Sequence, residues 1–438
     1  MSRRSGVAVP RCAAPAPGLH LSAALALTAL VASGCAVIPT PGAFYDLAEP
    51  PPASKPGDVL RSEPMPGAPD GSSAFRVLYR STGMAGEPTV VSGVVIVPAV
   101  SAPPGGRKVV AWAHPTTGVA RDCAPSLLGE GFFSSVQGLS ELLALGYVVT
   151  ATDYPGLGTA GPHPYLVGLS EGQSLLDGVR AAHRLEQAQA GPLFAVWGHS
   201  QGGHAALFAG QLAATYAPEL SLVGVAAAAP ATDLGAMLEA ALGTNFGNLL
   251  TAYSVWSWSR VYAAPIAGLV KPTRLPAMNR AASRCIRNQI EGLRAVGDVL
   301  ALRDGFLAAD PSRTEPWNLL MQRNRPGWEP RAWKPAPAPG PGEVEVTVKP
   351  PGGPTFVEVP AGAPLFIAQG TADFVVQPAI TAHFVADLCR RGERVRYLEM
   401  KEVGHIEAGE SAAGAAVTWM LARFEGAPAP STCPLVGR

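Results

Sequence analysis

The feature that most constrains this chain is a glycine-flanked serine between an apolar run and a helical segment. Gly198-His199-Ser200-Gln201-Gly202 follows the apolar run Leu193–Trp197 and opens a predicted helix, Gln201–Tyr216. At such a turn the serine takes a strained backbone conformation, and Gly198 and Gly202 let the neighbouring backbone pass without a Cβ clash. The pentapeptide therefore predicts a nucleophile elbow with Ser200 as the nucleophile. The alternative is a Gly-rich turn without chemistry.

Segments of strand and helix character alternate around this turn. Two β-branched runs, Arg76–Ser81 and Val90–Pro98, predict an antiparallel opening pair. The strands expected after it are Val109–Ala113, Tyr147–Thr152, Leu193–Trp197, Leu222–Ala229, Leu365–Gln369 and Val395–Met400. The helices expected around them are Val136–Leu145, Leu169–Leu185, Gln201–Tyr216, Ile380–Arg391 and Ala412–Phe424. Near-continuous apolar strands alternating with helices indicate an α/β fold with a mostly parallel sheet flanked by helices.

The alternation stops in one long internal segment, residues 231–360. It contains the apolar helical stretches Leu234–Ala241, Leu249–Ala263 and Ala281–Leu302, followed by the Pro-rich segment Pro326–Pro354. This predicts a helical cap inserted into a core made of residues 71–230 and 361–438, although the Pro-rich part could instead be a flexible linker. The apolar candidates for the walls of an acyl pocket are Phe246, Leu249, Leu250, Trp256 and Trp258. These side chains could equally form the core of the cap itself.

The N-terminus has the features of a targeting segment. Arg3, Arg4 and Arg11 precede an apolar stretch, Leu19–Ser33, that is shorter than the roughly 20 residues of a membrane span. Residues 1–35 are therefore interpreted as a signal peptide, and the small residues before Cys35 resemble a bacterial lipobox. Acylation of Cys35 would anchor the protein to a membrane surface, whereas ordinary secretion would cleave after Gly34 or Ala36. Residues 36–70, rich in Pro, Gly and Ala, are expected to form a tether without regular structure.

Charge and cysteine content limit the classes of partner. Lys+Arg and Asp+Glu are both 33 and there is no basic run, which argues against a nucleic-acid partner. Four cysteines remain after the targeting segment, namely Cys123, Cys285, Cys389 and Cys433. An even number in an exported protein predicts two disulfides, with three possible pairings. No cysteine or histidine cluster indicates a metal, and no cofactor is expected.

A serine nucleophile needs a base, and the base needs an orienting acid. Asp373 follows the predicted strand Leu365–Gln369, and His405 follows the predicted strand Val395–Met400. Both therefore lie at the carboxyl edge of the sheet, in the chain order serine, acid, histidine. A solvated turn aspartate and a loop histidine are the alternatives for the two residues taken singly.

Other acidic and imidazole side chains fit these roles less well. Asp233 follows the strand Leu222–Ala229 and is the second choice for the acid. Asp153 precedes the serine in the chain and is expected to be structural. His199 and His204 adjoin the serine, but turn and helix geometry directs them away from the position of the base, so packing roles are expected.

The oxyanion of an acyl-transfer site needs two hydrogen-bond donors. The backbone N–H of Gln201, directly after the nucleophile, is the first expected donor. The second is expected from Thr117 in the loop His114-Pro115-Thr116-Thr117-Gly118, which follows the strand Val109–Ala113. A simple Thr-Gly turn is the alternative.

Together these segments resemble the secreted lipase family of α/β-hydrolases, of the fungal lipase A type. Besides the elbow, the resemblance rests on three segments and a dipeptide: His114-Pro115-Thr116-Thr117-Gly118, Asp122-Cys123-Ala124-Pro125-Ser126, Asp153-Tyr154-Pro155-Gly156 and Gly404-His405. It runs from about Leu60 to the C-terminus, and the lipobox would make this chain a bacterial member. The resemblance implies an α/β-hydrolase fold with a large helical cap, and a catalytic triad of Ser200, Asp373 and His405. It also implies the disulfides Cys123–Cys285 and Cys389–Cys433. The fungal type carries an acidic side chain at the position of Thr117, so the resemblance implies only the backbone role there.

The expected activity is hydrolysis of carboxylic esters, with a lipid or small-molecule ester as substrate. A triacylglycerol lipase or esterase is the first hypothesis. A serine peptidase on the same fold and a non-catalytic surface lipoprotein are the alternatives. Labelling by a serine-directed phosphonate separates enzyme from binder, and aminoacyl anilides separate peptidase from esterase.

Overall fold

The computed structural model describes residues 39–303, 305–328 and 360–433. In these ranges one sheet of nine strands has the order β1-β2-β3-β5-β4-β6-β7-β8-β9. The strands are β1 (Val59–Met65), β2 (Ser72–Thr82), β3 (Pro88–Pro98), β4 (Arg107–Ala113), β5 (Val148–Thr152), β6 (Ala190–His199), β7 (Ser221–Ala228), β8 (Leu365–Gly370) and β9 (Val395–Met400). The pairs β1–β2, β2–β3 and β3–β5 are antiparallel, and the rest of the sheet is parallel. The expected mostly parallel sheet and its antiparallel opening pair are confirmed.

Helices cover both faces of this sheet. The flanking helices are α1 (Glu130–Phe133), α2 (Leu139–Ala144), α3 (Gly168–Arg184), α4 (Gln201–Tyr216), α10 (Pro378–Arg390) and α11 (His405–Phe424). Alternate residues of β4 point to opposite faces: Val109 and Ala111 pack in the cluster that includes α3, α4 and α10, whereas Val110 and Trp112 pack with α2 and α11. The period of two along a buried strand thus places a hydrophobic layer on each side of the sheet.

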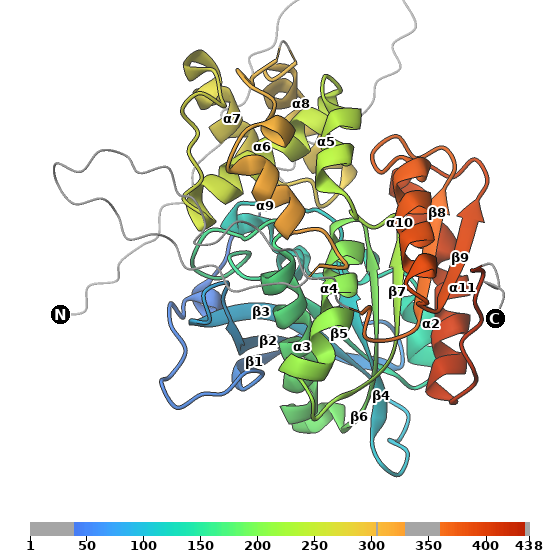
Figure 1. Cartoon of the computed structure of the whole chain (residues 1–438). Coiled ribbons are helices and arrows are strands. Elements are labelled where there is room, and N and C mark those ends of the chain that lie inside the picture. Colours follow the sequence, from blue (N-terminus) through green and yellow to red (C-terminus); the bar gives the residue numbers. More distant parts are fainter. Residues whose placement is uncertain (1–38, 304, 329–359, 434–438) are drawn as a thin grey trace, which may run out of the picture. The chain divides into compact units, whose positions relative to one another are not determined.

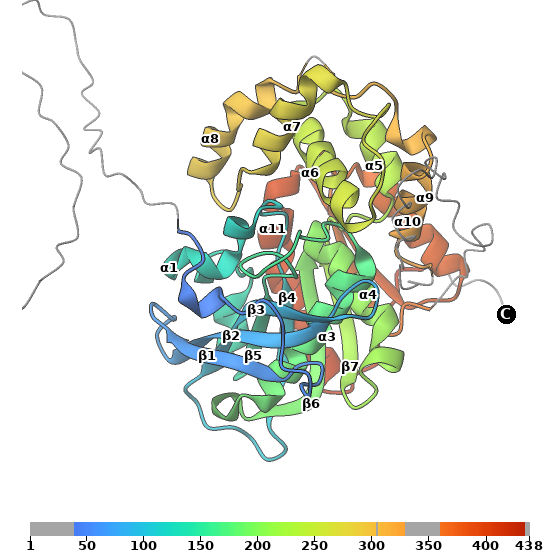
Figure 2. The ribbon, with the colours of Figure 1, turned by 90° about the vertical axis from the view of Figure 1, so that its left-hand side faces the viewer.

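Between β7 and β8 the chain forms a separate group of helices. They are α5 (Leu234–Ala241), α6 (Asn245–Val261), α7 (Leu275–Ala282), α8 (Gln289–Leu300) and α9 (Trp317–Arg323). These helices share a hydrophobic cluster of their own, built around side chains such as Trp258, Phe306 and Trp317. Figures 1 and 2 show them gathered on one side of the α/β layers. The helical part of the predicted insertion therefore has its own core, while residues 329–359 of the Pro-rich stretch lie outside the described residues.

Some predicted boundaries were wrong. Residues 36–70 were expected to lack regular structure, but β1 pairs with β2 and a 3-10 turn (Ala43–Tyr45) buries Tyr45. β1 is an edge strand whose residues are mostly half-buried, so its sequence lacks an apolar run and tolerates Pro64. The N-terminal segment 1–38, including Cys35, lies outside the described residues.

Two helices also differ from the prediction. The segment 281–302 was predicted as one helix, but α7 ends at Ala282 and α8 begins after Asn288, whose side chain accepts the N–H of Glu291 as an N-cap. The last helix begins at His405 and not at residue 412. The predicted start was late because the first turns of this Ala-rich helix contain polar residues and lack an apolar pattern. No helix in the described ranges has both the length and the apolar character needed to cross a membrane.

Candidate active site

Ser200 lies at the turn between β6 and α4 in a strained backbone conformation. Its φ is 57° and its ψ is −117°, a region that residues with a Cβ rarely occupy. A Cβ on Gly202 would lie 1.8 Å from the carbonyl oxygen of Ala113, and a Cβ on Gly198 would lie 2.2 Å from that of Gly202. The Ser200 N–H donates to the carbonyl of Ala228 on β7 (2.9 Å). The two glycines are therefore required sterically for the turn that presents this serine.

The structure joins Ser200 to the histidine and the aspartate expected from the sequence. His405 Nδ1 lies 2.8 Å from Asp373 Oδ2, and His405 Nε2 lies 2.9 Å from Ser200 Oγ. Because a carboxylate only accepts hydrogen bonds, Nδ1 carries the proton and Nε2 is left to accept from the serine hydroxyl. All three residues are at most 9% exposed. The geometry is that of a nucleophile, a base and an acid that orients the base.

Asp373 is held as a carboxylate. Its Oδ1 accepts the N–H groups of Val375 and Val376 (both 2.8 Å), and its Oδ2 also accepts from Gln369 Nε2 (3.0 Å). Burial disfavours the charge, but the hydrogen bond and charge of His405, with the two backbone N–H groups, hold the pKa of Asp373 below its usual value. The ionised carboxylate of Asp373 fixes the tautomer of His405.

The remaining sequence candidates lie outside this chain of hydrogen bonds. Asp233 caps α5 through the Ala236 N–H and pairs with Arg325 (3.2 Å). Asp153 is buried and accepts from the hydroxyls of Ser92 and Ser126. Both contacts are structural.

The two histidines beside Ser200 are buried and hydrogen-bonded. His199 Nε2–H donates to the carbonyl of His405 (2.9 Å), and burial lowers the pKa of His199 to about 3, so this ring is neutral. His199 therefore helps to fix the backbone of the base, His405, through this hydrogen bond. His204 faces Glu171 on α3 (2.8 Å). Glu171 was not singled out in the sequence; the signal that could have found it is a glutamate between two glycines, Gly168 and Gly172, at the start of a predicted helix.

The two expected oxyanion residues lie on different elements. Gln201 is the first residue of α4, where backbone N–H groups lack helical partners. Thr117 is buried in the loop after β4, its carbonyl accepts the N–H of Ile286 (2.9 Å), and its hydroxyl has no partner among the described residues. The position of Thr117 is thus fixed by a cap segment distant in sequence.

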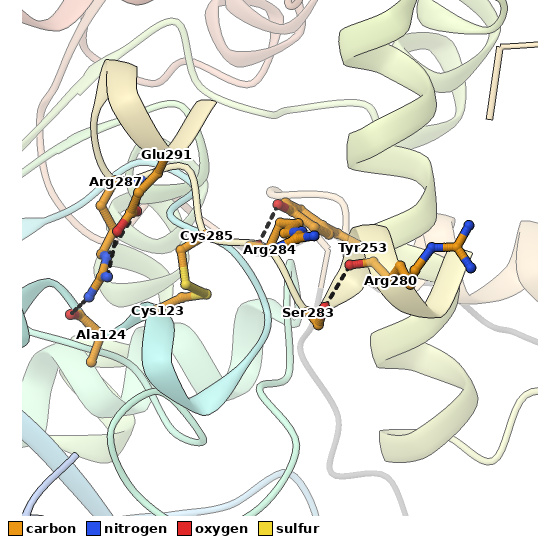
Figure 3. Close-up of a disulfide and its surroundings, with 9 residues drawn as sticks. All are labelled: Cys123, Ala124, Tyr253, Arg280, Ser283, Arg284, Cys285, Arg287 and Glu291. Atoms are coloured by element: carbon orange, nitrogen blue, oxygen red, sulfur yellow. Dashed lines mark hydrogen bonds and ion pairs between the residues drawn. A yellow bond between two sulfur atoms is a disulfide. The ribbon is translucent and has the colours of Figure 1, made fainter. Parts of the chain in front are cut away.

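A disulfide adjoins that contact. Cys123 is bonded to Cys285, with Cα atoms 5.1 Å apart, and a second disulfide joins Cys389 to Cys433. Figure 3 shows the first disulfide between the Cys123–Ala124 segment and the cap, with Tyr253 donating to the Arg284 carbonyl beside it (2.8 Å). The structure therefore contains the pairing that the family resemblance implied, and it ties the cap to the loop that carries Thr117.

An apolar pocket opens beside Ser200 and extends into the cap. Its walls come mainly from α5, α6 and the segment before α3, and include Tyr165, Leu166, Leu234, Leu238, Leu250, Trp258, Met321 and Val375. Of the five predicted wall residues, only Leu250 and Trp258 line it. Leu249 belongs to the cap core, and Trp256 lies under Arg260, whose guanidinium carbon is 3.9 Å from the ring centroid. Within the described ranges, no group of three His, Cys, Asp or Glu side chains could hold a metal ion.

The model of the secretory lipase family matches residues 135–286 and 357–432, which make up more than half of the 438 residues. The chain belongs to the secretory lipase family. Among the relatives of this chain, Lipase 10 of Candida albicans is 25% identical over 405 residues, covering 87% of this chain and 80% of that protein. A probable inactive lipase of Mycobacterium tuberculosis is 32% identical over 209 residues, covering 44% of this chain and 46% of that protein.

Solved structures agree on the fold of this family member. Candida antarctica lipase A matches with a TM-score of 0.71 at 19% identity, covering 89% of this chain and 87% of that one. The rice cell wall degrading esterase LipA of Xanthomonas oryzae matches with a TM-score of 0.62 at 18% identity, covering 85% and 98%. The α/β-hydrolase fold is therefore confirmed, and family and fold support carboxylic ester hydrolysis. Family and disulfides also support export.

Proposed function

We propose that this protein hydrolyses lipid esters through an acyl-enzyme formed on Ser200. One observation carries the proposal: the hydrogen-bonded chain Asp373–His405–Ser200 ends at a serine that lines an apolar pocket. A relative is named an inactive lipase. The complete constellation of nucleophile, base and acid in this chain supports an active enzyme instead.

The first half of the reaction acylates the serine. Ser200 Oγ attacks the carbonyl carbon of the ester while its proton moves to His405 Nε2, and Asp373 stabilises the resulting imidazolium. The tetrahedral intermediate then collapses. The bond to the alcohol oxygen breaks, the His405 proton passes to that oxygen, and the alcohol leaves.

The second half releases the acid. A water molecule gives a proton to His405 Nε2 and attacks the acyl carbon, and collapse of this intermediate returns the proton to Ser200 Oγ. In both halves the oxyanion accepts the backbone N–H groups of Gln201 and Thr117. These donors, fixed before the reaction begins, stabilise a charge that exists only in the transition state and the intermediate.

The pocket determines the proposed substrate class. Leucine, methionine and tryptophan side chains of the cap and core line it next to Ser200 and offer few polar groups. When an acyl chain enters the pocket, its apolar surface is removed from water. This burial contributes up to about 0.8 kcal/mol of binding free energy per methylene. Helices α5 to α9 therefore act as a cap that binds the acyl chain.

For the N-terminus we keep the lipid anchor as a proposal. Small residues before Cys35 match a lipobox, and an acylated cysteine there would hold the enzyme at a membrane surface. Metabolic labelling with a palmitate analogue, compared between wild type and Cys35→Ser, tests it. Label retained in Cys35→Ser would reject this anchor.

Two measurements test the activity itself. A serine-directed phosphonate should label Ser200, and Ser200→Ala should lose on the order of 10⁴-fold in kcat while remaining folded. On soluble p-nitrophenyl esters, kcat/KM should rise up to about fourfold per methylene from acetyl to about octanoyl. A steady fall over this series would reject the lipase proposal in favour of a short-chain esterase, and preference for aminoacyl anilides would indicate a peptidase.

Leu249 and Leu250 provide a matched pair of variants for the pocket. They are neighbours on α6, but only Leu250 lines the pocket, whereas Leu249 is 3% exposed in the cap core. Leu250→Ala should shift the preferred acyl chain to longer esters. Leu249→Ala should cost roughly 2–5 kcal/mol of stability and leave the preference unchanged.

A further inference from the structure

A buried carboxylate that the proposed reaction does not use contacts the first turn of α4, next to the nucleophile elbow. Glu171, on α3, is 0% exposed. It reaches α4 because the two helices approach closely: a Cβ on Gly168 would lie 2.2 Å from the Phe208 ring, and one on Gly172 would lie 3.0 Å from the Ala209 nitrogen. Such a charge is tolerated in the interior only where donors surround it.

Three donors surround Glu171. Its Oε1 accepts the backbone N–H of Leu166 (3.0 Å) and the side-chain Nε2–H of Gln201 (2.7 Å). Its Oε2 accepts from His204 Nδ1 (2.8 Å). The carboxylate therefore bonds the residue after the nucleophile, a wall residue of the pocket and the first turn of α4 at once.

His204 connects Glu171 to the cap. Its Nδ1 lies 2.8 Å from Glu171 Oε2, and its Nε2 lies 2.8 Å from the carbonyl oxygen of Asn324. The two ring nitrogens therefore join the carboxylate on α3 to the backbone of the cap. Asn324 follows α9 in the cap, and its side chain also accepts the Gly168 N–H (3.1 Å). The network thus extends from Gln201 to the cap.

We propose that Glu171 is a positioning residue for the oxyanion hole. By binding the Gln201 side chain, it keeps the backbone N–H of Gln201 in a fixed position relative to the Ser200 hydroxyl. The inference rests on the proposed function, in which that N–H stabilises the oxyanion. Through Leu166 and the His204–Asn324 contact, the same carboxylate also couples the oxyanion donor to the acyl pocket and the cap.

A buried carboxylate on the same helix shows what a purely structural role looks like. Asp177 is also 0% exposed and accepts from Ser81, Tyr216 and Arg180. None of these partners belongs to the elbow or the pocket. Asp177→Asn is therefore the matched control, because it disturbs a buried network of α3 away from Ser200.

The test compares Glu171→Met, Glu171→Gln and Asp177→Asn. Methionine has a similar length but no carboxylate, whereas glutamine keeps an oxygen for Leu166 and Gln201 and can donate to a neutral His204. Four quantities are measured: kcat and KM for p-nitrophenyl butyrate, affinity for a trifluoromethyl ketone whose serine adduct carries an oxyanion, and Tm.

Glu171→Met should lower kcat by about 10- to 100-fold and leave KM within about twofold of wild type. The affinity for the ketone should fall by a similar factor, because a misplaced donor affects only the oxyanion. Glu171→Gln should restore kcat to within about threefold of wild type. Asp177→Asn should lower Tm without changing kcat. If Glu171→Met does not fold, Gln201→Ala, which keeps the backbone N–H but removes the side-chain bonds to Glu171 (2.7 Å) and His163 (3.1 Å), should show the same loss of kcat and ketone affinity.

Unchanged kcat and ketone affinity in Glu171→Met, or in Gln201→Ala where the former is unfolded, would overturn the positioning role. Equal losses in Asp177→Asn would also overturn it. Phosphonate labelling of the wild type separates the two proposals: absence of label on Ser200 rejects the proposed function, whereas labelled Ser200 with an unaffected Glu171→Met rejects only the positioning role.

Discussion

Removing the Cys123–Cys285 disulfide should affect both stability and catalysis. The bridge closes a loop of 162 residues, whereas Cys389–Cys433 closes one of 44. The entropy that a cross-link removes from the unfolded chain gives about 5 kcal/mol for the first bridge and about 4 kcal/mol for the second. The double variants Cys123→Ala/Cys285→Ala and Cys389→Ala/Cys433→Ala should therefore lose comparable stability in urea unfolding.

Catalysis should distinguish the two bridges. Next to Cys285, the Ile286 N–H donates a hydrogen bond to the carbonyl of Thr117. The disulfide also packs against this loop, since a Cβ on Gly118 would lie 2.6 Å from Cys123 Sγ. Loss of this bridge should release the loop that carries the second proposed oxyanion donor and lower kcat on p-nitrophenyl butyrate by about tenfold or more. The second bridge joins the end of α10 to the C-terminal segment, so its loss should leave kcat unchanged. Equal effects of both double variants on kcat, at a temperature where both are folded, would refute this reasoning.

Three further outcomes follow from the structure. Asp373→Asn should lose about 10⁴-fold in kcat because it stabilises the wrong tautomer of His405, whereas Asp233→Asn should remain active; the reverse result would move the acid to Asp233. The free energy of unfolding should fall from pH 6.5 towards 4, because burial lowers the pKa of His163 to about 4 and that of His199 to about 3. In this pH window the unfolded chain binds more protons than the folded chain, so each histidine lowers the free energy of unfolding by about 2 kcal/mol at pH 5. Equal urea midpoints at pH 7 and pH 5 would contradict neutral buried rings. Gly202→Ala should destabilise by about 3 kcal/mol or more, since its Cβ would meet the Ala113 carbonyl at 1.8 Å. Its control, Gly414→Ala on α11, meets nothing within 4 Å and should stabilise by roughly 0.5–1 kcal/mol in thermal unfolding.

The sequence by itself determined the features that depend on local backbone chemistry. An apolar strand, two glycines and a helix are enough to predict the elbow at Ser200, because the steric requirement lies within five consecutive residues. The positions of Asp373 and His405 followed from the same logic, since residues after parallel strands meet at one edge of the sheet. The sheet and its flanking helices were predictable for a similar reason, as buried strands carry continuous apolar runs.

Only the tertiary structure decided which side chains meet across long distances. The strand β1 escaped prediction because an edge strand buries little, and its pairing with β2 depends on the partner strand. Leu249 and Leu250 are identical residues on one helix, and only the packing of α6 against its neighbours places Leu250 in the pocket. Glu171 meets Gln201 and His204 because glycines let α3 and α4 approach, which no local pattern specifies. Local steric requirements depend on consecutive residues, whereas a pocket or a buried hydrogen-bond network arises from the close packing of distant segments.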